Sequence, residues 1–126
     1  MTTHRIESVG RELQEVIAEL LRTEIDDPLI GFVTVTDVEM SPDLKHARVY
    51  FSVLGDEEDK RDTGRGLRRA AKRLRGLIAE RMELRYVPEL RFILDETAEQ
   101  AARIEALLRQ EAEELDLEEP EADDQQ

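Results

Sequence analysis

The sequence predicts an α+β domain in which helices cover one face of a three-stranded sheet. Three observations carry this prediction. The chain has 126 residues, the length of one domain. Apolar residues recur at helical spacing near the N-terminus and again after residue 65, and the segments between them are rich in β-branched residues. The expected order is helix, strand, strand, helix, helix, strand and a further helix, which suits a two-layer fold.

The first helix is expected from about Ile6 to Glu24. It should end before Pro28, because the residue preceding a proline disfavours helical dihedrals, and Gly31 then permits a turn. Its apolar face follows the helical period and consists of Ile6, Val9, Leu13, Val16, Ile17, Leu20 and Leu21.

Two strands are expected next, joined as a hairpin. The first runs from Phe32 to Met40, and its apolar phase changes near Thr36-Asp37, which predicts a β-bulge. A turn follows at Ser41-Pro42-Asp43. The second strand, Lys45 to Leu54, alternates strictly. Its core-facing residues are expected to be Ala47, Val49, Phe51 and Val53.

The second half of the domain is expected to contain two helices and a strand. An acidic segment at residues 56–62 begins one helix, Thr63 to Gly66 reads as a turn because glycine weakens helices, and a basic helix follows to about Met82. Arg85 to Leu94 reads as a short strand that contains Pro88. The domain is therefore expected to span residues 1–95.

Two segments are expected after the domain. A helix over residues 96–114 should start at Thr97, with Gln100 as its capping-box partner. From Glu111 onward there are nine acidic residues and no basic one, so residues 115–126 are predicted to form a disordered acidic tail.

One stretch differs in charge from the rest of the chain. Residues 65–91, the basic island, hold eight Arg and one Lys against three Glu, a formal charge of +6, whereas the whole chain carries −13. A polyanionic partner explains this contrast, and a solvated helix face is the alternative. The candidate residues for binding such a partner, which are RNA-binding residues under the family resemblance given below, are Arg65, Arg68, Arg69, Lys72, Arg73, Arg75, Arg81 and Arg85.

These cations lie mostly off the apolar stripe of their helix, so replacing Arg69, Lys72, Arg73 or Arg75 is expected to leave the core undisturbed. Arg suits phosphate because its planar fork donates two hydrogen bonds. Tyr86 and Tyr50 are candidates for stacking on a base.

Composition and motifs argue against several other classes of protein. Cysteine is absent, so no disulfide, thiolate metal site or thiol nucleophile exists. No phosphate-binding glycine loop or calcium-loop spacing occurs, and His4 and His46 are the only histidines. We expect no enzyme activity, no metal and no cofactor. The N-terminus lacks the apolar core of a signal peptide, and no apolar run has membrane-spanning length, so a cytoplasmic protein with no membrane contact is expected. We also expect a monomer.

Four stretches together resemble ribosome-binding factor A, a bacterial family. They are the end of the first helix, RTEIDDP, then DPLIGFVTVTDVEMSPDL (Asp26 to Leu44), ARVYFSVLG (Ala47 to Gly55) and LRRAAKRLRGLIAERMELRYVPEL (Leu67 to Leu90). The resemblance covers about Arg5 to Asp95. It implies a KH-like domain of type II topology that binds small-subunit ribosomal RNA late in maturation, supports processing of the RNA 5′ end and is not an enzyme.

The resemblance also implies a helix kink, here at Ala70, Ala71 and Lys72. Lys72 stands where the family's Ala-x-Gly kink has Gly, and Leu29 stands where the family usually has Arg after Asp-Pro. Two other functions stay open from the residues alone: a general single-stranded RNA or DNA binder, and a protein adaptor whose basic helix docks an acidic partner.

Overall fold

The computed structural model describes residues 3–118, and these residues form three helices and three strands. In order they are α1 (Thr3–Thr23), β1 (Phe32–Met40), β2 (His46–Leu54), α2 (Glu57–Arg81), β3 (Glu89–Leu94) and α3 (Thr97–Glu118). The chain divides after Asp95 into two units. The α+β class is confirmed, and β1 has the predicted bounds.

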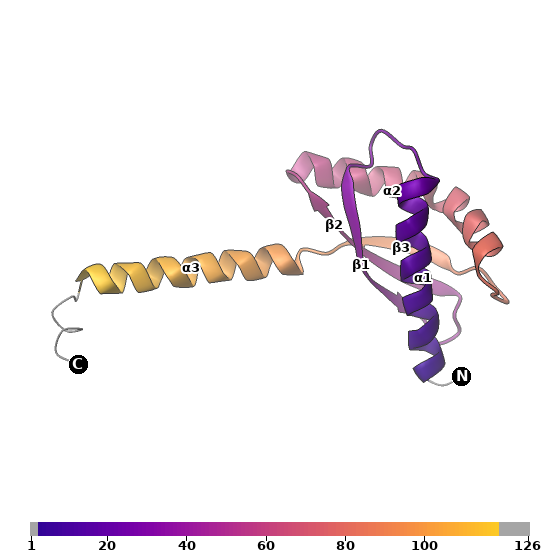
Figure 1. Ribbon diagram of the computed structural model, residues 1–126, viewed down its shortest axis with the longest axis horizontal. Coiled ribbons are helices and arrows are strands. Elements are labelled where there is room, and N and C mark those ends of the chain that lie inside the picture. The colour runs from indigo at the N-terminus through magenta and orange to yellow at the C-terminus, as the bar shows by residue number, and fades with distance from the viewer. Residues whose placement is uncertain (1–2, 119–126) are drawn as a thin grey trace. The chain divides into compact units, whose positions relative to one another are not determined.

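The first unit consists of one sheet and two helices (Figure 1). The strands lie in the order β1-β2-β3, with β2 antiparallel to β1 and parallel to β3. The pairing register shifts between Val35 and Asp37, which confirms the predicted bulge. Helix α1 packs against β1, α2 packs against β2 and β3, and the two helices also contact each other.

The core lies between the helices and the sheet. The alternation predicted for β2 is confirmed, since Ala47, Val49, Phe51 and Val53 are all buried. Phe92 of β3 is buried as well. The helices contribute the largest fully buried apolar side chains, which are Leu13, Ile17, Leu20, Leu67, Leu74 and Ile78.

The turn predicted at Thr63 to Gly66 is wrong, because α2 is a single helix from Glu57 to Arg81. Its start is fixed by a capping box in which Asp56 and Asp59 each accept a hydrogen bond from the other's backbone N–H, both at 2.9 Å. Gly66 is needed for packing: a Cβ there would lie 2.6 Å from Ile30 Cγ1. The ribbon of α2 changes direction partway along its length (Figure 1), and the kink at Ala70, Ala71 and Lys72 stays a prediction.

The bounds of β3 and α3 also differ from the predictions. β3 begins at Glu89 instead of Arg85, because the preceding carbonyl groups of Val87 and Pro88 accept hydrogen bonds from a side chain of α2. α3 continues to Glu118, so the first four residues of the predicted tail, 115–118, are helical. The remainder of that tail lies outside the described residues. None of the helices in the described part of the chain has the length and apolar content to cross a bilayer.

Candidate nucleic-acid interface

Helix α2 has three faces, and each contacts a different part of the domain or its surface. Its buried face, at a spacing of three or four residues, consists of Leu67, Ala70, Leu74 and Ile78. A second face holds the loop between α1 and β1. A third face lines a groove beside the ends of the strands.

The second face binds the loop over residues 24–31 through polar contacts. The hydroxyl of Thr63 accepts a hydrogen bond from the Gly31 N–H at 3.1 Å. Arg69 donates to both carboxylate oxygens of Asp27, at 2.7 and 3.3 Å. The Arg69 hydrogen bond is also the main reason why the pKa of Asp27 lies below its ordinary value.

Arg73 completes this face. Its Nη2 donates to the Glu24 carbonyl oxygen at 3.3 Å, directly after α1, where helix carbonyls lack partners within the helix. Arg81 reaches α1 itself, with Nη1 3.4 Å from Glu19 Oε1. Arg65 pairs within α2, with Nη2 2.9 Å from Asp62 Oδ1.

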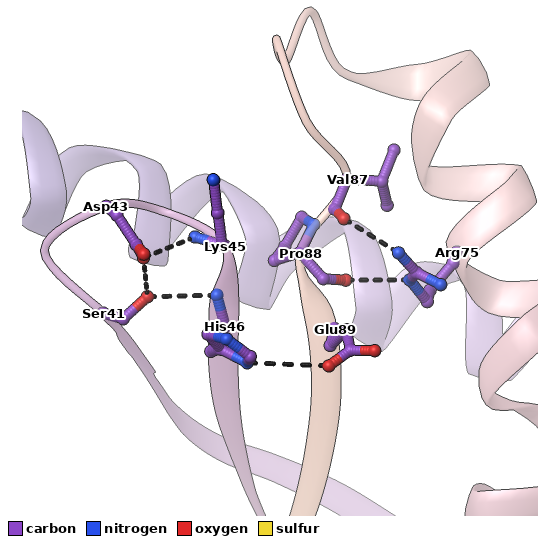
Figure 2. Close-up of polar contacts among 8 residues, drawn as sticks. All are labelled: Ser41, Asp43, Lys45, His46, Arg75, Val87, Pro88 and Glu89. Atoms are coloured by element: carbon purple, nitrogen blue, oxygen red, sulfur yellow. Dashed lines mark hydrogen bonds and ion pairs between the residues drawn. The ribbon is translucent and has the colours of Figure 1, made fainter.

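Arg75 has a structural role of its own (Figure 2). Its half-buried guanidinium donates from Nε to the Pro88 carbonyl and from Nη2 to the Val87 carbonyl, both at 3.0 Å. These bonds hold the segment that leads into β3. The expectation that Arg69, Arg73 and Arg75 can be replaced without disturbing the core stays a prediction. All three lie off the apolar stripe, yet each donates hydrogen bonds to a segment outside α2.

The third face of α2 is different, because two of its cations have no protein partner. Arg68 and Lys72 are exposed, and neither makes a hydrogen bond or ion pair with any residue between 3 and 118. They line a groove of about 960 Å³. Its other lining residues are Glu39, Met40, Ser41, Pro42, His46, Ala47, Arg48, Ala71, Arg75, Glu89, Leu90 and Arg91.

Two cations of this groove were not among the predicted contacts. Arg48 of β2 and Arg91 of β3 are direct neighbours in the parallel register. Arg48 pairs with Glu39 across the hairpin, Nη2 to Oε1 3.3 Å, whereas Arg91 is without a partner in the described residues. Arg91 belongs to the basic island, but only the strand register brings it beside Arg48.

The hairpin loop at one end of the groove is tightly bonded (Figure 2). The Ser41 hydroxyl donates to Asp43 Oδ1 at 2.7 Å and accepts from the His46 N–H at 3.0 Å. The Ser41 bond is the main cause that lowers the pKa of Asp43. Leu44 takes a positive φ of 62° in this loop, and its N–H donates to the Ser41 carbonyl at 2.9 Å. A fixed loop gives the groove a fixed wall.

The remaining predicted residues lie around this groove or near it. Arg85 lies outside α2, with its Cζ 5.7 Å from the ring centroid of Tyr86. Of the predicted kink residues, Ala70 is buried, Ala71 is half-buried and Lys72 is exposed. Tyr50 donates its hydroxyl to Glu39 at 3.0 Å, and this bond raises the pKa of Tyr50.

The groove can bind an anion but offers no metal site. Among residues 3–118 no group of three or more His, Asp or Glu side chains is arranged to hold a metal ion. His46 lies 3.7 Å from Glu89, and both are exposed. Cations without protein partners favour a polyanion that neutralises them, and RNA phosphate is such a ligand.

Comparisons with known proteins identify the family of this chain. The family model of ribosome-binding factor A matches residues 5–108. The chain belongs to this family. Ribosome-binding factor A of Thioalkalivibrio sulfidiphilus is 50% identical over 104 residues, 82% of this chain and 81% of the relative.

Two sets of coordinates for the Thermus thermophilus factor share the fold, which is KH-like. The crystal structure of its ribosome-binding factor A has a TM-score of 0.64 at 29% identity, over 71% of this chain and 93% of the other. A homology model of that factor, fitted into a cryo-electron-microscopy map of its complex with the 30S subunit, has a TM-score of 0.60 at 29% identity, over 71% and 94%.

Proposed function

We propose that this protein is an assembly factor that binds the small ribosomal subunit through its ribosomal RNA. It acts late in maturation of the subunit, supports processing of the RNA 5′ end, and works as a cytoplasmic monomer without enzyme activity. The observation that carries the proposal is the pair Arg68 and Lys72, whose charges no described residue neutralises although the whole chain carries −13. The Thermus relative, fitted into a map of its 30S complex, supports the choice of partner.

The arrangement suits recognition of RNA by phosphate contact and shape. Arg68 and Lys72 are one helical turn apart, and Arg91 of β3, which also has no partner among the described residues, lines the same groove. Such a row of cations contacts several phosphates of one strand, and these contacts set position without reading sequence. The acidic remainder of the chain repels RNA and so favours binding by this side of the domain.

The test is charge reversal in the groove. The double variant Arg68→Glu, Lys72→Glu should keep the fold and lose co-sedimentation with purified small subunits. A matched control is Arg11→Glu, Arg61→Glu, which makes the same change in net charge at two exposed residues outside the groove. The control should still co-sediment. If both variants bind like the parent, the groove is not the interface.

Salt dependence and ribonuclease treatment separate the rival functions. Each phosphate neutralised by the parent should add close to one unit to the slope of log affinity against log salt, and Lys72→Ala should lower that slope by about one. Digestion of the RNA should release the protein. A partner that stays bound after digestion would indicate a protein adaptor, and equal affinity for unrelated RNA would indicate a general binder.

The role in 5′-end processing needs a cellular readout. In cells whose native copy is removed, the parent should restore the mature 5′ end of the small-subunit RNA, and the groove variant should leave the unprocessed precursor. Restoration by the groove variant would separate processing from RNA binding by this surface and so contradict the proposal.

A further inference from the structure

A second, smaller cavity of about 330 Å³ lies beside Tyr86, between α2 and the segment that leads into β3. It shares three lining residues, His46, Arg75 and Glu89, with the large groove, so the two spaces adjoin. Tyr86 is 52% exposed. Two cations lie near its ring: Lys45 Nζ is 5.1 Å and Arg85 Cζ is 5.7 Å from the ring centroid.

We propose that this cavity binds one unpaired base of the RNA, stacked on Tyr86, with the adjacent phosphates contacting Lys45 and Arg85. The inference rests on the proposed function and extends it, because it adds a site for a base to a groove that contacts phosphate. Single-stranded RNA is commonly recognised by bases stacked on exposed aromatic rings.

The walls of the cavity are held in place before any ligand binds (Figure 2). Arg75 fixes Val87 and Pro88 through their carbonyl groups at 3.0 Å. The Glu89 N–H donates to the Lys45 carbonyl at 2.9 Å, which joins the hairpin loop to the start of β3. A site already ordered in the free protein loses little conformational entropy on binding.

The charges at the wall of the cavity are largely used by the protein itself. The guanidinium of Arg75 donates to the Val87 and Pro88 carbonyls, and the carboxylate of Glu89 lies 3.7 Å from His46. Lys45 and Arg85 are exposed, near the ring. Stacking of a base on an aromatic ring is stronger than an exposed cation–π contact, so a base displaces the cations from the ring and leaves them free for phosphate.

The experiment compares two RNA probes that have equal charge. One is an eight-residue oligoadenylate, and the other is an abasic oligomer of the same length that has the same phosphates and no bases. The full chain should bind oligoadenylate more tightly than the abasic probe. Tyr86→Ala should weaken oligoadenylate binding by about tenfold or more, the range expected for loss of one stacked base, and leave abasic binding unchanged. Tyr86→Phe keeps the ring and should bind like the parent.

Two outcomes would overturn the inference. In one, the parent binds both probes equally. In the other, Tyr86→Ala keeps the full preference for oligoadenylate. Neither outcome decides the proposed function, which depends on Arg68 and Lys72 and is measured with small subunits. Conversely, if the groove variant still bound small subunits, the proposed function would fail, but a preference for oligoadenylate that depends on Tyr86 would still support the base site. Equal thermal stability of parent and Tyr86→Ala, measured beforehand, ensures that lost binding does not reflect unfolding.

Discussion

Two groups of cations lie on α2, and they differ in what they contact. Arg69, Arg73 and Arg75 donate hydrogen bonds to acceptors of other elements of the same domain. Arg68 and Lys72 directly precede Arg69 and Arg73 in the sequence, yet they have no partner among residues 3–118. A run of basic residues therefore does not show which of its members can bind nucleic acid. The cations that are already bonded within the domain have to be identified first.

Measurements of the free energy of unfolding test this comparison. The largest loss of stability is expected from a substitution in the core. Phe51 is 3% exposed in the middle of β2, and it belongs to the buried core to which both helices contribute. Phe51→Ala should lower the free energy of unfolding by about 3–5 kcal/mol, a large part of the roughly 5–15 kcal/mol available to a domain. Urea denaturation followed by circular dichroism measures this. An unchanged midpoint would mean that the core is not as described.

The comparison itself predicts different results for two neighbouring cations. Arg75→Ala leaves the Val87 and Pro88 carbonyls without their donor, which should cost about 1–3 kcal/mol of stability. Lys72→Ala removes a cation without a protein partner and should change stability by less than about 0.5 kcal/mol. The same denaturation assay compares them. Equal losses in the two variants would remove the distinction between structural and free cations.

A pair of glycines in α2 tests the contact with the α1–β1 loop. At Gly66 a Cβ would lie 2.6 Å from Ile30 Cγ1 and 3.2 Å from Leu29 Cβ, whereas at Gly76 nothing lies within 4 Å. Gly66→Ala should therefore destabilise by about 1–2 kcal/mol through overpacking. Gly76→Ala should stabilise by about 0.5–1 kcal/mol through helix propensity. Melting temperatures that shift in the same direction would contradict this account of Gly66.

The sequence predicted the sheet and the core better than the roles of individual cations. Strict alternation at Val49, Phe51 and Val53 defines a buried face whatever surrounds it. The helix period separates Arg69 from the core but cannot show that Asp27, 42 positions earlier, lies opposite it. The turn predicted at Gly66 is wrong for a similar reason. A glycine weakens a helix locally, and only the tertiary contact with Ile30 explains its presence there. Arg48 lies in the groove because the parallel register of β2 and β3 places it beside Arg91, and the sequence alone does not give that register.

The smallest expected effect concerns the ion pair between Arg69 and Asp27. Hydrogen bonding to Arg69 lowers the pKa of Asp27 below 3.8 in the folded protein. A group with a lowered folded pKa stabilises the fold above its unfolded pKa, and this contribution is lost as pH falls through the folded value. Arg69→Gln should therefore cost stability at neutral pH and lose less than the parent on acidification below about pH 4. Lys72→Gln removes one cation without a carboxylate partner, so its loss of stability with acid should parallel that of the parent. Urea midpoints measured from pH 7 down to pH 3 compare the three proteins. Parallel curves for all three would show that Arg69 does not stabilise the charged form of Asp27, and that it belongs with Arg68 and Lys72 among the free cations.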